Sequence, residues 1–220
     1  MTTAGDARRD HDATPRHCIL QRRQVLIGAG GAMMLASLAA CSKSSEAPAP
    51  GAPAAAPAAA AAGGNPRQTF DAAARGTGFT VGQPMSARSV QVFFDPQCPH
   101  CATLWVAARP LHDRIRMVWM PVAFISPKSA PQGALILGAQ DPVALMNTHE
   151  TLLASGQGGL AVPGAGDPDL LSKVRANTDL WRTLDGNSVP FMVYRAGAEG
   201  PYGTQSGGMP TAQLAQLLGL

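Results

Sequence analysis

Two cysteines separated by a proline and a histidine directly follow an apolar segment, and this limits the folds open to the chain. Residues 90–94 predict a strand, and residues 95–97 predict a tight turn before Cys98. Pro99 favours the first turn of a helix, because its missing N–H would have no partner there in any case. A helix N-terminus stabilises an anion, so we expect Cys98 to be a reactive thiolate at an exposed tip. Cys101 lies one turn later, and we expect it to be more enclosed and to resolve a mixed disulfide.

The residues between the cysteines tune this chemistry. His100 can place a cation or a hydrogen-bond donor near the Cys98 sulfur, which lowers the pKa of that thiol. A stabilised thiolate makes the disulfide easier to reduce, so we expect the pair to be an oxidant. A structural disulfide or a metal site is the alternative for a Cys-x-x-Cys pair. A structural zinc site needs about four ligands, and the predicted domain offers only His112 and His149 besides His100, both expected at the surface.

The first 41 residues predict an export signal. Arg22 and Arg23 precede an apolar stretch, residues 25–40, which is short for a membrane span and resembles the twin-arginine export pattern. An ordinary secretory leader is the alternative. Residues 38–41, Leu-Ala-Ala-Cys, look like a lipobox, in which Cys41 carries a diacylglycerol. Cleavage near Ala40 without lipid, or an uncleaved anchor, is the alternative. We therefore expect a periplasmic protein anchored to a membrane by lipid.

Residues 42–66 contain Ala, Pro, Gly and Ser with little else, and this composition predicts a disordered tether. The chain has a formal net charge of +3, but Lys and Arg nearly balance Asp and Glu from Ser42 onward. No basic stripe indicates binding to nucleic acid.

From residue 67 onward the pattern predicts an α/β domain. The expected order is a strand, a helix, a strand, a helical insertion over about 129–184, a pair of strands and a last helix, which is typical of a thioredoxin-like fold. A strand-to-helix junction is also where such a fold carries a Cys-x-x-Cys. The expected helices are 69–75, 98–109, 130–139, 142–153, 167–184 and 210–218, and the expected strands are 89–94, 114–122, 190–194 and 201–205. On this fold, a copper-binding or copper-delivery lipoprotein and a lipoprotein that only holds partners are the alternatives to a redox enzyme.

The predicted domain resembles the catalytic domain of DsbG, within the DsbA/DsbC/DsbG group of bacterial thiol:disulfide interchange proteins. The resemblance rests on residues 93–101, Trp105 with residues 108–110, residues 134–142 and residues 187–190. It implies a thiol-disulfide oxidoreductase that acts on exported proteins, needs no soluble cofactor and is recycled by a membrane redox partner. Oxidase, isomerase and reductase directions all stay open. The resemblance also implies a cis Pro190 facing the disulfide, with the Val189 backbone free to pair with an extended substrate. Trp105 is expected in the core or beside the substrate groove.

Two features depart from the resembled pattern. His100 stands where DsbG-type proteins usually carry Tyr, which brings the active dipeptide closer to the DsbA kind. DsbC and DsbG proteins also have an N-terminal dimerisation domain, and residues 67–89 are too short to form one. We therefore expect a monomer without dimer-based isomerase activity.

Overall fold

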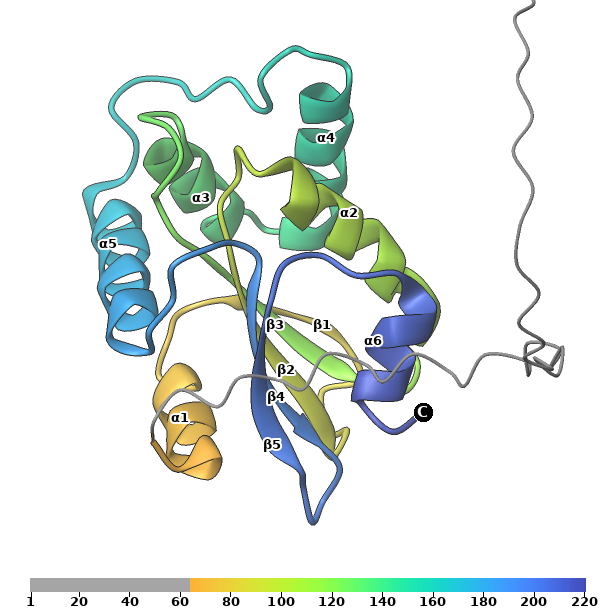
Figure 1. Cartoon of the computed structure of the whole chain (residues 1–220). Coiled ribbons are helices and arrows are strands. Elements are labelled where there is room, and N and C mark those ends of the chain that lie inside the picture. The colour runs from red at the N-terminus through yellow and green to blue at the C-terminus, as the bar shows by residue number, and fades with distance from the viewer. Residues whose placement is uncertain (1–63) are drawn as a thin grey trace, which may run out of the picture. The chain divides into compact units, whose positions relative to one another are not determined.

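The structure, a computed structural model, describes residues 64–220, which form a mixed five-stranded sheet in the order β1-β3-β2-β4-β5 with helices around it (Figure 1). The strands are β1 (Phe79–Gly82), β2 (Arg88–Phe94), β3 (Arg116–Pro121), β4 (Phe191–Ala196) and β5 (Tyr202–Ser206). The helices are α1 (Pro66–Ala73), α2 (Pro99–Ala108), α3 (Ser129–Leu137), α4 (Pro142–Ala154), α5 (Pro168–Thr183) and α6 (Thr211–Leu217), with a short 3-10 turn, η1 (Arg109–Leu111). Among residues 64–220, no helix is long and apolar enough to cross a membrane.

The central strand β2 places the cysteine pair at one end of the sheet. All of its residues except Arg88 are buried, because it lies between β3 and β4 and is covered on both faces. β2 and β3 are parallel, which requires a crossover, and α2 supplies it. Phe94 pairs with Pro121, so both strands end at the same edge of the sheet. The turn that carries Cys98 therefore leaves the sheet at the carboxyl edge of its two parallel strands.

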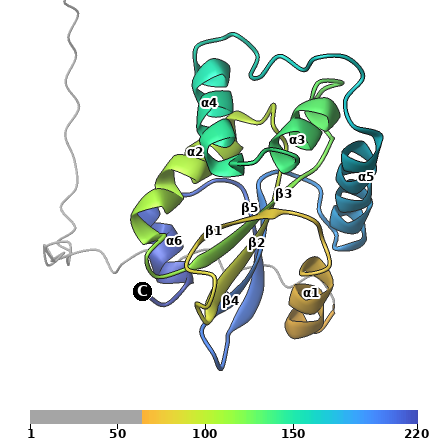
Figure 2. The same cartoon turned by 180° about the vertical axis from the view of Figure 1, so that it is seen from behind.

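The helices form two layers and a cap. Figure 1 shows α1 and α5 on one side of the sheet and α2 and α6 on the other, and the view from behind in Figure 2 shows the same arrangement. α1 packs on β4 and β5, and α5 packs on β3. α3 and α4 lie beyond the edge where β2 and β3 end, and α4 contacts α2. The insertion thus reaches the helix that begins at the cysteine pair.

Four of the helices begin with the same kind of dipeptide. Asn65, Asp141 and Asp167 each accept a backbone N–H with the side chain and are followed by a proline in the first turn. Such side chains satisfy N–H groups that have no partner within the helix. Cys98, followed by Pro99, takes the same capping position in α2, and its sulfur accepts the N–H of Cys101. A thiol here occupies the place of a capping carboxylate.

The thioredoxin-like order of elements predicted from the sequence is confirmed, and one strand was missed. The edge strand β1 has only four residues and is flanked by glycines, so its sequence gave no clear strand signal; its pairing with β3 holds it in place. α1 begins at Pro66, three residues before its predicted start at Thr69.

Trp105 lies in the core, which is one of the two positions expected for it. Its side chain is 1% exposed, and its ring centre lies 5.0 Å from that of Trp119. The leader, Cys41 and nearly all of the tether lie outside the described residues.

Candidate active site: the Cys98–Cys101 pair

The turn before the cysteines is held by the buried carboxylate of Asp95. One oxygen accepts the Gln97 N–H at 2.8 Å and the Ser129 hydroxyl at 2.6 Å, and the other accepts the N–H groups of Phe124 and Ile125 at 2.7 and 2.9 Å. Hydrogen bonds to a carboxylate are stronger than neutral ones, so these four bonds join the turn to the loop after β3 and to the start of α3. The sequence identified Asp95 only as a turn residue, because its partners come from distant segments.

His149 of α4 holds the same turn from the insertion. Its Nε2 lies 2.6 Å from the Pro96 carbonyl oxygen, and its Nδ1 accepts the Leu160 N–H at 3.2 Å, so the proton is on Nε2 and the ring is neutral. Burial lowers the pKa of His149, which favours this neutral form. A Cβ at Gly159, where φ is +80°, would collide with the His149 ring. The expectation that His149 lies at the surface is wrong: the side chain is fully buried, because the loop after α4 folds over it.

Cys98 is more enclosed than the sequence predicted. Pro99 and His100 are exposed, but Cys98 is only 3% exposed and Cys101 is fully buried, so the expected exposed tip at Cys98 is wrong. The reason is that the Cys98 sulfur turns inward, where it donates a hydrogen bond to the Val189 carbonyl oxygen at 3.4 Å. The Val189 carbonyl is therefore not free when Cys98 is a neutral thiol. Both cysteines are free thiols in this structure.

The two thiols differ strongly in acidity. The pKa of Cys98 is lowered to about 6, chiefly because the Cys101 thiol donates to the thiolate; burial opposes this, and the backbone N–H groups of Cys101 and His100 reinforce it. The positive charge of His100 makes the smallest of these contributions. The pKa of Cys101 is raised well above its ordinary value by burial and by its hydrogen bond to Cys98. At neutral pH the pair is a thiolate at Cys98 and a thiol at Cys101.

The segment opposite the pair contains the proline implied by the resemblance. The Val189–Pro190 peptide bond is cis, and the Pro190 carbonyl accepts the Gly207 N–H at 2.8 Å. A Cβ at Gly208 would lie 2.9 Å from the His100 carbonyl oxygen, so the chain after β5 passes close to the start of α2. Two backbone segments, one at Val189 and one at Gly208, thus border the cysteine pair.

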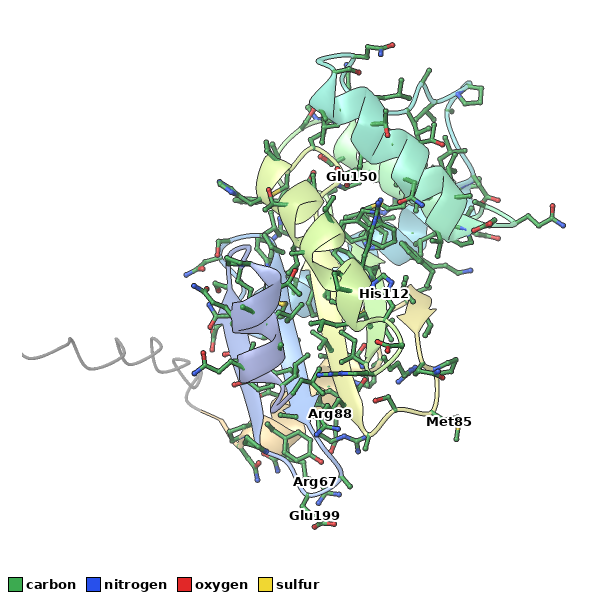
Figure 3. All side chains as sticks on the ribbon, turned by 90° about the vertical axis from the view of Figure 1, so that its right-hand side faces the viewer. Arg67, Met85, Arg88, His112, Glu150 and Glu199 are labelled. Carbon is green, nitrogen blue, oxygen red and sulfur yellow. The ribbon has the colours of Figure 1, made fainter. Side chains whose placement is uncertain are left out.

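The remaining titratable residues of the described part of the chain do not form a metal site. His112 is half-buried beside Trp105, and burial lowers its pKa. Within residues 64–220, no three His, Cys, Asp or Glu side chains are grouped so that they could hold a metal ion. Glu150 is an ionisable residue near the pair that sequence reasoning missed: it lies on α4 and is only 8% exposed (Figure 3). Its sequence signal was weak, because a Glu inside a helix is usually solvated.

A strand that leads into a Cys-Pro-His-Cys turn and helix, opposed by a cis-proline segment, defines a thioredoxin-like domain. Solved structures agree on the fold. The catalytic domain of Proteus mirabilis ScsC aligns with a TM-score of 0.54 and 18% identity, covering 70% of this chain and 94% of that one. A periplasmic thioredoxin-like protein from Salmonella enterica serovar Typhimurium aligns with a TM-score of 0.53 and 18% identity, covering 69% and 94%.

In sequence, the domain is DsbG-like. The chain is 30% identical over 141 residues to the thiol:disulfide interchange protein DsbG of Pseudomonas aeruginosa, covering 63% of this chain and 54% of that protein. It is 31% identical over 107 residues to DsbG of Escherichia coli, covering 48% and 42%. The chain thus spans about half the length of the curated relatives it matches. No family model matches it.

Proposed function

We propose that this domain exchanges disulfides with exported proteins in the periplasm through Cys98 and Cys101. The observation that carries the proposal is the asymmetry of the pair, since the pKa of Cys98 is lowered to about 6 while that of Cys101 is raised. A thiolate attacks or leaves readily, and a neighbouring thiol that keeps its proton can wait to resolve the intermediate. Both sequence relatives are thiol:disulfide interchange proteins, which supports this activity.

In the oxidising direction, a substrate thiolate attacks the Cys98 sulfur and the Cys98–Cys101 bond breaks. Cys101 leaves as a thiolate and takes a proton, because its pKa is raised. A second substrate thiolate then attacks the substrate sulfur of the mixed disulfide. This step forms the substrate disulfide and releases Cys98 as a thiolate. The substrate loses two electrons and the domain gains them. The low pKa of Cys98 makes it a good leaving group, which favours this direction.

The Val189 backbone provides a place for the substrate chain. A neutral Cys98 thiol donates to the Val189 carbonyl, but a thiolate has no proton to donate. Ionisation, or disulfide formation, therefore releases this carbonyl to accept an N–H from an extended substrate beside Pro190. Recognition through the backbone suits clients of varied sequence.

Trapping a mixed disulfide tests the proposed exchange. A peptide with an internal disulfide is incubated with Cys101→Ala and, as the matched control, with Cys98→Ser. We expect Cys101→Ala to form a lasting covalent adduct on Cys98, seen by mass spectrometry, and Cys98→Ser to form none on Cys101. Adducts at equal rates on both variants, or on neither, would contradict the assigned roles.

The direction of transfer is tested by the reduction potential of the pair. We propose an oxidant, nearer to the roughly −120 mV of DsbA than to the roughly −270 mV of thioredoxin. Titration of the pair against glutathione measures this value. A potential below about −230 mV, which is typical of glutaredoxins, contradicts the oxidant proposal.

We also propose that lipid on Cys41 anchors the protein and that the Ala/Pro-rich residues between Cys41 and Asn65, the cap of α1, tether the domain. We further propose that the domain is a monomer recycled by a membrane redox partner. The lipobox-like sequence at residues 38–41 supports the lipid anchor, and the Ala/Pro-rich segment after it supports the tether. Cys41→Ala should change the mature mass and release the protein from membranes, and unchanged mass and membrane association would refute the anchor. Light scattering at micromolar concentration checks the monomer.

A further inference from the structure

Glu150 lies on the side of α4 that faces the helix of the cysteine pair. Three residues earlier on α4, Asn147 accepts the indole N–H of Trp105 from α2 at 2.9 Å. Residues three apart share a helix face, so Glu150 continues this contact surface by one turn. Its Oε2 is buried and has no hydrogen-bond partner among residues 64–220. An ionised carboxylate here would lose the hydration of Oε2 without gaining a partner for that oxygen.

Arg109 brings a positive charge to this surface, where it donates to Asn147 at 2.6 Å one turn before Glu150, but the described residues include no ion pair between Arg109 and Glu150. α3, which also packs on α4, has no titratable residue. On α4 itself, His149 is neutral and engaged with Pro96. From the turn, Asp95 is negative and already accepts four hydrogen bonds. α2 brings His100, which is exposed, and the two thiols Cys98 and Cys101.

Of these groups, Cys98 is the one whose charge changes with redox state. The pKa of Glu150 is raised to about 8, chiefly by burial and in smaller part by the negative charge of the Cys98 thiolate. In the disulfide, Cys98 carries no charge, so this part of the effect disappears. Glu150 therefore ionises more easily in the oxidised domain than in the reduced one.

We propose that Glu150 is a positioning residue that takes up a proton when the Cys98–Cys101 disulfide is reduced and releases it when the disulfide forms. The proposal rests on the function proposed above. Reduction breaks the sulfur–sulfur bond with two electrons from a substrate dithiol, which gives up two protons as it closes its own disulfide. One proton goes to Cys101, Glu150 takes up a share of the other and the rest goes to solvent, while Cys98 remains a thiolate. Reduction then releases less than one proton to solvent.

This coupling has a measurable signature in the exchange with glutathione. The more of the second glutathione proton Glu150 takes up, the less the equilibrium constant changes with pH. Without Glu150, one proton is released per disulfide reduced. The constant for reduction of the domain then rises about tenfold per pH unit between the pKa of Cys98 and that of free thiols, which is about 8.5.

The test compares the full chain in detergent with Glu150→Gln, Glu150→Asp and Glu199→Gln. Glu199 is exposed and lies between β4 and β5, so its change controls for loss of one carboxylate. The redox state of the Cys98–Cys101 pair is measured at pH 6.5 to 8 by mass spectrometry of the tryptic peptide that carries both cysteines. We expect a tenfold rise per pH unit in Glu150→Gln, and a clearly smaller rise in the wild type, Glu150→Asp and Glu199→Gln.

Equal slopes in the wild type and Glu150→Gln would overturn the inference while leaving the proposed exchange intact. A pair that does not react with glutathione at all would instead overturn the proposed function. If Glu150→Gln does not fold, infrared difference spectra between the reduced and the oxidised wild type test the inference instead. Reduction at pH 7.5 should increase the carbonyl band of a protonated carboxylic acid, and an unchanged band refutes the inference.

Discussion

The thiol of Cys98 donates a hydrogen bond to the carbonyl oxygen of Val189, with 3.4 Å between sulfur and oxygen. The two residues are 91 positions apart, and they meet because β2 and β4 are neighbours in the sheet. The same sulfur accepts the Cys101 N–H, so it has a partner in either protonation state. The Cys101 N–H therefore holds the sulfur in both states, whereas the Val189 carbonyl holds it only as a thiol.

Removing the Cys101 thiol should raise the pKa of Cys98. The hydrogen bond from Cys101 is the largest cause of the lowered value of about 6, so Cys101→Ala should move the pKa toward 9. Cys101→Ser keeps a donor at this position and should have a smaller effect. The pH dependence of alkylation by iodoacetamide measures both variants. The same pKa in the Ala and Ser variants would argue against the hydrogen bond as the cause.

Replacing His100 should have a smaller effect than replacing Cys101. The charge of His100 makes the smallest contribution among the causes that lower the pKa of Cys98, and its backbone N–H is retained in His100→Ala. We expect a rise of less than about one pH unit, which corresponds to less than about 1.4 kcal/mol. Thiolate absorbance at different pH values checks this. A rise as large as that in Cys101→Ala would make His100 the main determinant.

The stability of the reduced form, relative to the oxidised form, should fall as the solution is acidified. The Cys98 pKa is about 6 in the folded state and 9.0 in a model thiol, so the folded thiolate contributes stability that is fully present above pH 9. This contribution decreases as the pH falls and is lost below about pH 6, whereas the disulfide has no thiol to titrate. In Glu150→Gln, which has no carboxyl group to take up the second proton, the difference between reduced and oxidised melting temperatures should therefore move in favour of the reduced form from pH 5 to pH 7. A constant difference would contradict the lowered pKa.

Asp95→Asn should destabilise the domain strongly. The amide retains one acceptor oxygen and turns an NH₂ group toward N–H donors, so at least one buried donor loses its partner. We expect a loss of about 3 kcal/mol in the free energy of unfolding, measured in urea. Asp141→Asn is the matched control, because Asp141 also precedes a proline but caps an exposed helix start, where Asn serves about as well. Similar losses in both variants would mean that the buried hydrogen bonds of Asp95 stabilise the domain no more than an exposed helix cap does.

The parts of the molecule predicted correctly from the sequence are those with local signals. The apolar run of β2 and the Pro99 helix start depend on neighbours in the chain, and both were found. The burial of His149 depends on the loop after α4 and on the turn at Pro96, and the burial of Glu150 depends on how α4 packs against α2. No periodicity within α4 shows either contact. The inward turn of the Cys98 sulfur likewise depends on Val189, which the resemblance placed nearby but without this bond.

The hydrogen bonds that tie the insertion to the active turn have a consequence for protein engineering. Asp95 is bonded to Ser129 in α3, and Pro96 is bonded to His149 in α4, so the turn takes its shape from segments 34 and 53 residues further along the chain. Grafting the four residues from Cys98 to Cys101 onto another scaffold would leave this support behind. A transplant that keeps the geometry of the turn must extend at least from β2 through Leu160, about a third of the chain, and must add the Val189–Pro190 segment that borders Cys98.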